Sequence, residues 1–197
     1  MTQIHRRIPQ RKRIFVGGEG ASECNYVKWL SDLCRDKNIP VKLDIHDLGR
    51  GGNSLNRIEM AARKIRHEEE NREQYKHKFL ILDADKIENQ HEEQACKDKA
   101  TKNGKLIIIW QRPCHESFLL RHFTPRENHL PATSDHAMTQ LKKIWPDYQK
   151  NMPVRQIGQT LSLDGARRVA QNLLEFQNFL RIIGLLQDRN LNHRNSS

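Results

Sequence analysis

The sequence predicts an α/β fold in which a parallel sheet of about four strands is flanked by helices, followed by a helical C-terminal extension. Short apolar segments alternate with amphipathic helical segments between residues 14 and 110, an order typical of parallel sheets. Phe79–Leu82 is apolar without interruption, as strands buried on both faces of such a sheet usually are. The chain has 197 residues, which suffices for one domain and a modest extension.

The first half of this alternation contains two strands and two helices. Ile14–Val16 is a short apolar strand that stops at two glycines, and Val41–Ile45 alternates apolar with polar residues, as a half-buried strand does. Ser22 and Ser54 each precede apolar residues spaced three and four apart. We therefore expect two helices that these serines cap.

The second half supplies the other two strands and the helices that follow them. Proline favours the first turn of a helix, so Pro113 is expected to open one. The apolar faces of the last helices are expected to cover the sheet. The elements predicted after residue 76 are a strand at Phe79–Leu82, a polar helix at about 89–102, a strand at Leu106–Trp110, a short helix from Pro113 to about Phe123, and longer helices at about 135–150 and 163–186.

Four segments are predicted along the chain. No stretch approaches the roughly 18–20 apolar residues of a membrane span, and the basic N-terminus lacks the apolar run of a signal peptide, so we expect a soluble, cytoplasmic protein. The four cysteines form no C-x-x-C pair, which favours reduced thiols over a zinc site. The segments are a basic arm at 1–12, an α/β domain at 13–125, the helical extension at 126–186 and a disordered tail at 187–197.

The charge balance points to a polyanionic partner. There are 34 Lys and Arg against 24 Asp and Glu, a formal net charge of +10. Such a balance favours binding to nucleic acid or an anionic surface, and it argues against a small-molecule enzyme of neutral or acidic overall charge. Aromatic residues make up 6 %, too few for an evident base-stacking platform, so recognition of the backbone or of a structured RNA is the better expectation.

Carboxylates follow the first and third predicted strands. Glu19 lies among glycines after the first strand, and Asp83 and Asp85 follow the third. In a sheet of order 2-1-3-4 these two loops meet at the switch point, where ligands bind. Converging carboxylates repel one another unless a cation shares the site, and oxygen ligands suit Mg²⁺ or Mn²⁺. Glu19 is then a further ligand or a general acid/base, and Glu23 completes a second metal site.

These motifs allow two other interpretations. Acidic residues at strand ends often only cap helices or sit in turns, and a D-x-D pair is frequent by chance. The glycine-flanked Glu19 in the neighbouring loop favours the metal site over that interpretation. The glycines do not form a P-loop, because the G-K-[ST] ending is missing and Glu19 would face a phosphate with like charge.

Two motifs carry a resemblance to a known family. The segments IFVGGEGASE and FLILDADK, which contain Glu19 and the D-x-D pair, resemble a Toprim domain, the catalytic fold of topoisomerases, primases and overcoming-lysogenization-type nucleases. One branch, the RloB-like (AbiL-type) proteins linked to anti-phage defence, has motifs similar to Glu19-Gly20 with Glu23 and Tyr26, and to the run from Arg112 to Phe123. The resemblance covers about residues 13–125.

The resemblance implies Mg²⁺-dependent phosphodiester chemistry and assigns roles to the residues that match. It departs from the family at Ser22, Arg112 and His115, which stand where Thr, Asn and Phe are expected. We interpret His122 as a structural hydrogen-bonding histidine that supports the site, although imidazole also suits proton transfer. The predicted catalytic residues are Glu19, Asp83, Asp85 and Glu116, and the predicted metal ligands are Glu19, Glu23, Asp83 and Asp85.

Basic residues near these motifs are the candidates for holding flanking phosphates. The alternative is that they only solubilise the chain, which is the usual role of scattered surface cations. The predicted nucleic-acid-binding residues are Arg6, Arg7, Arg11, Lys12, Arg13, Arg50, Lys86 and Arg112.

Two functions follow as expectations. The first is a Mg²⁺- or Mn²⁺-dependent Toprim nuclease that cleaves DNA or RNA, with tRNA as one candidate substrate, in anti-phage defence. The second is a nucleic-acid-binding or partner-sensing module that does not cleave alone. Because the related nucleases carry an ATPase in the same chain, we expect a separate ATPase or another defence protein as a partner. The oligomeric state is left open.

Overall fold

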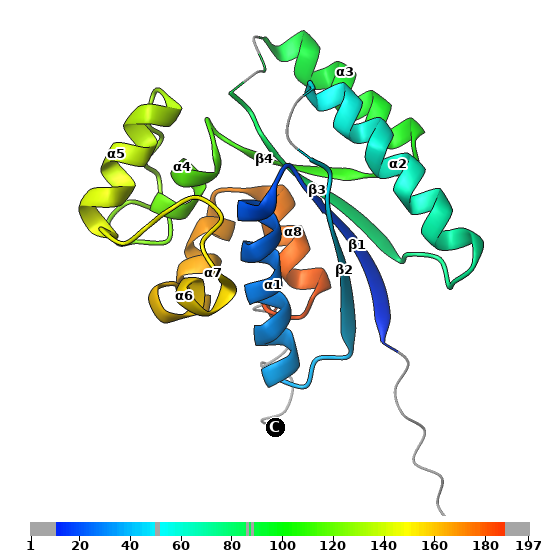
Figure 1. Ribbon diagram of the computed structural model, residues 1–197, viewed down its shortest axis with the longest axis horizontal. Coiled ribbons are helices and arrows are strands. Elements are labelled where there is room, and N and C mark those ends of the chain that lie inside the picture. Colours follow the sequence, from blue (N-terminus) through cyan, green and yellow to red (C-terminus); the bar gives the residue numbers. More distant parts are fainter. Residues whose placement is uncertain (1–10, 50–51, 86, 88, 188–197) are drawn as a thin grey trace, which may run out of the picture.

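A computed structural model of the protein describes residues 11–49, 52–85, 87 and 89–187. These residues form one parallel sheet with the strand order β2-β1-β3-β4, flanked by helices on both faces (Figure 1). The predicted α/β fold class and the predicted strand order are therefore confirmed. The strands are β1 (Lys12–Gly18), β2 (Val41–Asp47), β3 (His77–Asp83) and β4 (Ile107–Gln111).

Eight helices lie within the described residues, and they form two layers. In Figure 1, α2 and α3 cover one face of the sheet, while α1 and α8 cover the other, with α4 to α7 alongside them. No helix in this part of the chain is both long and apolar enough to span a membrane. The helices are α1 (Ala21–Asp36), α2 (Ser54–Glu70), α3 (Gln90–Lys102), α4 (His115–Leu120), α5 (Ser134–Ile144), α6 (Val154–Thr160), α7 (Leu163–Gln171) and α8 (Leu174–Ile182).

Alternating strand residues supply a separate core on each side of the sheet. Successive side chains of a strand point to opposite faces, so neighbours such as Phe79 and Leu80 enter different cores. On the side of α2 and α3 the strands contribute Phe15, Leu80, Leu82, Ile108 and Trp110. On the side of α1 and α8 they contribute Ile14, Val16, Phe79, Ile81 and Ile109.

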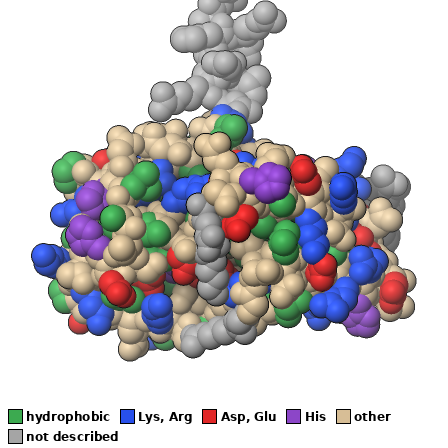
Figure 2. Space-filling view, turned by 90° about the horizontal axis from the view of Figure 1, so that it is seen from above, with side chains coloured by type: hydrophobic (Ala, Val, Ile, Leu, Met, Phe, Trp, Pro, Cys, Tyr) green, Lys and Arg blue, Asp and Glu red, His purple; other side chains and the backbone are tan. Residues whose placement is uncertain are grey.

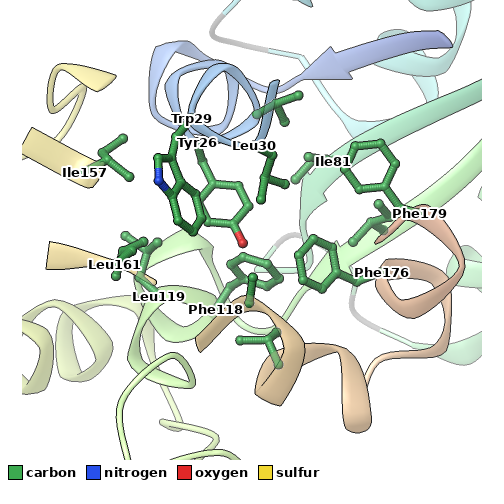
Figure 3. Close-up of a cluster of buried hydrophobic side chains, with 14 of the residues drawn as sticks. Tyr26, Trp29, Leu30, Ile81, Phe118, Leu119, Ile157, Leu161, Phe176 and Phe179 are labelled. Carbon is green, nitrogen blue, oxygen red and sulfur yellow. The ribbon is translucent and has the colours of Figure 1, made fainter. Parts of the chain in front are cut away.

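The larger core joins the sheet to the C-terminal helices, as the close-up in Figure 3 shows. Tyr26 of α1 meets Phe118 of α4 edge-on, with ring centroids 5.2 Å apart. Phe179 of α8 packs against Phe79 of β3 at 4.9 Å. The division at residues 125 and 126 stays a prediction, although both predicted segments contribute to this core. Apolar faces of the last helices cover the sheet, as expected.

Both predicted helix caps are wrong by one or two residues. The N-cap of α1 is Gly20, and that of α2 is Asn53, whose side chain accepts a hydrogen bond from the Asn56 N–H at 2.9 Å. An asparagine oxygen satisfies a first-turn donor as well as a serine does, so Ser54 lies inside the helix. The Ser22 hydroxyl instead accepts a hydrogen bond from the Asn151 N–H at 3.0 Å.

The helices after β4 are shorter and more numerous than predicted. Pro113 precedes α4, whose N-cap is Cys114, rather than opening the helix. α5 ends at Ile144 because Pro146 disfavours helical geometry at the residue before it. The expected helix at 163–186 is divided into α7 and α8, because Leu173 is extended and redirects the chain onto the sheet. α6 was not predicted, and the tail beyond residue 187 lies outside the described residues.

Candidate functional site

A pocket of about 250 Å³ opens beyond the carboxyl ends of β1 and β3, where the strand order reverses. Four carboxylates from four different segments line it. Glu19 follows β1, Asp83 ends β3, and Glu23 and Glu116 lie in the first turns of α1 and α4. The structure therefore brings these four predicted residues together, and we call this the carboxylate pocket. Its lining is Glu19, Gly20, Ala21, Ser22, Glu23, Asp83, His115, Glu116, Lys150 and Asn151.

A buried arginine fixes the Glu19 side chain. One carboxylate oxygen lies 2.8 Å from Nη2 of Arg57, whose side chain is 2 % exposed. The other oxygen accepts a hydrogen bond from the Asp83 N–H at 3.1 Å. Arg57 reaches out of α2 and also donates to the Gly52 carbonyl at 3.0 Å. Glu19 is thus held between the helix layer and the end of β3, and its charge is balanced by Arg57.

Glu23 has a structural role at the start of α1. Its carboxylate accepts a hydrogen bond from the Gly20 N–H at 2.8 Å, which satisfies a first-turn donor of the helix. The other carboxylate oxygen lies 3.9 Å from Nδ1 of His115, a buried histidine that also contacts the Gln111 side chain at 3.1 Å. The interpretation of strand-end acids as helix caps therefore holds for Glu23, which nevertheless faces the pocket.

Asp83 is the most perturbed carboxylate of the pocket. Burial, and then the neighbouring charges of Glu23, Glu19, Asp85 and Glu116, together raise its pKa to about 8. Its Oδ1 atom is buried and has no hydrogen-bond partner among the described residues. Without a cation, Asp83 therefore carries a proton at neutral pH.

Glu116 is buried at the start of α4, where a negative side chain interacts favourably with the helix dipole. The Tyr148 hydroxyl donates a hydrogen bond to it at 3.2 Å. Burial, and then the charge of Glu116, raise the pKa of Tyr148, so this hydroxyl stays protonated. The connection between α5 and α6 thus supplies a donor to one carboxylate of the pocket.

Asp85 does not line the carboxylate pocket. The strand ends at Asp83, and the Ala84 N–H is bonded to the carbonyls of Gln111 and Pro113, which turns the chain away. The Asp85 side chain is exposed, although it is close enough to contribute to the raised pKa of Asp83. Of the two predicted aspartates, only Asp83 remains in the strand and lines the pocket.

The pocket matches a hard cation in its chemistry but is not a ready-made metal cage. Among the described residues, no group of three or more His, Cys, Asp or Glu side chains is arranged to hold a metal ion. The donors that face the pocket are carboxylate oxygens, which Mg²⁺ and Mn²⁺ prefer. The unpartnered Oδ1 of Asp83 is the atom that such an ion would satisfy.

Those predicted basic residues that the structure describes do not line this pocket. Arg13 is buried at the amino end of β1, where it pairs with Asp44 at 2.7 Å and stacks over Tyr75, so its predicted contact with nucleic acid is wrong. Arg11 and Lys12 are exposed at that same end of the sheet, opposite the carboxylates.

Of the remaining predicted cations, one forms an ion pair and the others lie outside the described residues. Arg112 pairs with Glu93 of α3. Figure 2 shows basic and acidic side chains interspersed over the visible face rather than segregated into one basic surface. Four of the predicted nucleic-acid-binding residues lie outside the described residues, namely Arg6, Arg7, Arg50 and Lys86.

His122 lies in the core beyond the C-terminal end of α4, apart from the carboxylates. Its Nε2 is 3.1 Å from the Tyr26 hydroxyl, and its side chain is almost fully buried. Burial lowers its pKa to about 3, so the imidazole is neutral and does not exchange protons near neutral pH. This agrees with its interpretation as a structural hydrogen-bonding histidine.

The sequence did not predict Lys150, which lines the pocket, or Arg57 and Tyr148, which contact two of its carboxylates. Arg57 shares the inward positions of α2 with Ile58 and Ala61, and a charged residue in an otherwise apolar stripe was the signal available. Tyr148 and Lys150 follow α5 and reach the pocket only through the packing of the C-terminal helices. Nothing in their local sequence indicates that position.

The fold and the pocket define an α/β protein with an acidic site at the carboxyl edge of a parallel sheet. A model of the family described as RloB-like protein matches residues 14–180, which is most of the chain. The chain belongs to the RloB-like family, as the motifs predicted. The match extends through the C-terminal helices, beyond the segment over which the motifs were found. Comparisons with curated proteins and with solved structures found no match.

Proposed function

We propose that this protein is a Mg²⁺- or Mn²⁺-dependent nuclease whose active site is the carboxylate pocket. The observation that carries the proposal is Asp83, a carboxylate with an unpartnered buried oxygen and a pKa of about 8 among three glutamates. Strongly perturbed carboxylates in a pocket are typical of functional sites. The location at the switch point of a parallel sheet supports the same conclusion.

Asp83 and Glu19 are the residues proposed to hold the cation, with Glu23 and Glu116 as neighbouring carboxylates. A bound Mg²⁺ would polarise a phosphoryl oxygen and stabilise charge on the leaving oxygen. Arg57 keeps Glu19 oriented toward Asp83, and the Tyr148 hydroxyl keeps Glu116 in place. Lys150 lines the same pocket and offers a positive charge to a phosphate.

We also propose that the protein acts in anti-phage defence and has a separate partner, for which an ATPase is one candidate. They are supported only by the resemblance of the two motifs to defence-associated proteins. The substrate is proposed to be DNA or RNA because the chain carries a formal net charge of +10. Since the aromatic content is low, contacts with the phosphate backbone are favoured over base stacking.

A nucleic-acid-binding or partner-sensing module without its own cleavage activity is the second candidate. It is favoured by the charge balance of Glu19, which already has a cationic partner in Arg57 at 2.8 Å. It is also favoured by the absence of a ready-made three-ligand group from the described residues. In this case the carboxylates stabilise the loops at the sheet edge and do not act on a substrate.

Cleavage and metal binding are measured separately to distinguish the two. Plasmid, single-stranded DNA and tRNA are incubated with the protein and Mg²⁺, Mn²⁺ or a chelator, for the wild type and for Asp83→Asn, Glu19→Gln and the exposed control Asp36→Asn. The nuclease predicts cleavage that requires the metal and is lost in the first two variants only. Metal-independent binding without cleavage supports the module.

Titration of the protein with Mn²⁺ at pH 7 supplies a readout that does not depend on activity. Because Asp83 carries a proton at this pH, binding of a cation there releases a proton into the buffer. We expect calorimetry in two buffers of different ionisation enthalpy to detect that release in the wild type and in Asp36→Asn. Equal metal affinity and equal proton release in Asp83→Asn would exclude Asp83 as a ligand.

A further inference from the structure

A second pocket, of about 390 Å³, is lined mainly by residues of the α4–α5 connection and of the α6–α7 junction. Figure 1 shows these elements on the same side of the sheet as α1. Among the described residues that line it, Arg126 and Arg168 are the charged ones, and there is no Asp or Glu. Three hydroxyl-bearing residues complete its polar wall, namely Thr124, Thr160 and Ser162. We call it the arginine pocket. It is basic, whereas the carboxylate pocket is acidic.

Within the described residues, the hydrogen-bond partners of the two arginine side chains are uncharged. Nη2 of Arg168 donates to the His122 carbonyl at 2.6 Å, and Nη1 of Arg126 donates to the Gln140 side chain at 3.3 Å. Neither forms an ion pair within the described part of the chain, in contrast to the buried Arg57. The Nε atom of Arg168 is buried and has no hydrogen-bond partner there. A buried donor without an acceptor is costly, so an anionic ligand would stabilise this arrangement.

A buried histidine in the wall of the pocket is also incompletely bonded. The His122 side chain is 3 % exposed, and its Nδ1 has no partner among the described residues. A β-carbon built on Gly165 would lie 2.9 Å from that nitrogen, so Nδ1 faces the first turn of α7. α7 has nine residues and begins at the pocket with Ser162 as its N-cap. Helix N-termini favour anions, which adds to the field of the two arginines.

We propose that the arginine pocket binds a phosphate monoester, with the phosphate against Arg126 and Arg168. Guanidinium groups bind phosphate through paired hydrogen bonds, and the hydroxyls supply further donors. Apolar side chains, including Phe123 and Leu161, line the remaining wall and suit the organic part of such a ligand. The volume falls within the range of small-molecule sites, which is roughly 300–1,000 Å³.

Two sources carry this chemistry, a free nucleotide and the phosphorylated end of a nucleic-acid strand. Calorimetric titrations of the full chain with inorganic phosphate, adenosine monophosphate and matched oligonucleotides bearing a 5′-phosphate or a 5′-hydroxyl distinguish them. Equal affinity for the mononucleotide and the phosphorylated oligonucleotide identifies a nucleotide site. An affinity about tenfold or more higher for the phosphorylated oligonucleotide identifies a strand end.

Arginine variants test whether the pocket is the binding site. We expect Arg126→Gln and Arg168→Gln each to weaken binding of the phosphorylated probes by about tenfold or more. Arg155→Gln removes the same charge from an exposed position on α6 that does not line the pocket, and it should change the affinity by less than about twofold. All titrations contain a chelator, so that cleavage in the carboxylate pocket does not alter the probes and the result does not depend on the proposed nuclease activity.

Three results would overturn the proposal. They are an absence of binding for every phosphorylated probe, equal binding of the 5′-hydroxyl oligonucleotide, and equal losses in Arg155→Gln and Arg126→Gln. Since Arg168 also supports the His122 carbonyl, thermal unfolding of its variant is measured first. If Arg168→Gln does not fold, Arg126→Gln decides the result, because the Arg126 side chain donates its hydrogen bond to the half-buried Gln140 side chain and not to the core.

Discussion

The raised pKa of Asp83 predicts that the protein loses stability between pH 6.5 and pH 8 and that Asp83→Asn reduces this loss. Burial and the nearby glutamates raise the pKa to about 8 in the folded protein, whereas an aspartic acid in an unfolded chain has a pKa of about 3.9. The folded state therefore binds a proton that the unfolded state releases. Stability from this group is present at low pH and is lost as the pH rises through 8.

The size of this loss follows from the linkage between proton binding and folding. Because the folded state binds one more proton than the unfolded state, the free energy of unfolding falls by up to about 1.4 kcal/mol for each unit by which the pH rises. The loss between pH 6.5 and pH 8 is about 1.5 kcal/mol. His122 acts in the opposite direction below its unfolded pKa of about 6.5, because burial lowers its pKa to about 3 in the folded protein. Buried cysteines such as Cys24 also have a raised pKa in the folded protein, so the contribution of Asp83 is taken as the difference between the wild type and Asp83→Asn.

Urea unfolding, followed by tryptophan fluorescence in the presence of a chelator, measures the effect at pH 6.5, 7.0, 7.5 and 8.0. Across this range the wild type should lose about 1.5 kcal/mol more than Asp83→Asn does. Asp36→Asn, which alters an exposed carboxylate at the C-terminal end of α1, should retain the wild-type slope. Parallel slopes in the wild type and in Asp83→Asn would refute the reasoning.

Three further substitutions test the contacts of the two pockets. Arg57→Met removes the 2.8 Å ion pair with Glu19 and should lower the free energy of unfolding by about 2–3 kcal/mol. In the Arg57→Met background, Glu19→Gln should cost much less stability than it does alone, and additive losses in urea unfolding would contradict this. Tyr148→Phe removes the hydrogen bond to Glu116 and should cost about 1 kcal/mol, seen as a Tm lower by about 2–4 °C in calorimetry, whereas an unchanged Tm would argue against that bond. Gly165→Ala places a β-carbon 2.9 Å from a buried imidazole nitrogen and should cost about 1–3 kcal/mol in urea unfolding, and a neutral result would mean that this contact relaxes freely.

The sheet was predictable because its information is local. The uninterrupted apolar run at Phe79–Leu82 and the glycines after Ile14–Val16 identify strands and their ends within a few residues. The α/β alternation then fixes a parallel sheet, and the switch point places the loops after β1 and β3 side by side. Glu19 and Asp83 were found in this way, since their positions follow from the strands alone.

The exact partners of these carboxylates were not predictable from the same patterns. Arg57 reaches Glu19 from α2, and Tyr148 reaches Glu116 from the segment after α5, where the sequence contains no motif. Asp85 was misplaced because the alternation rule applies only while the chain remains extended, and β3 ends at Asp83. Such contacts depend on how the layers pack against one another, and the spacing of apolar residues within one segment does not predict that packing.

The two pockets are held in place by the same pair of helices, α1 and α4. Glu23 and Glu116 extend from the first turns of these helices into the carboxylate pocket. Tyr26 lies less than one turn beyond Glu23 on α1, and its hydroxyl contacts His122, which lines the arginine pocket at the other end of α4. Because the Tyr26 ring is fully buried against Phe118 in a close-packed core, the separation of the pockets is set by side-chain packing and not by the surrounding loops. A substitution at Tyr26 therefore alters the wall of the arginine pocket and the support of the carboxylate pocket together, whereas a substitution in either rim affects only one of them.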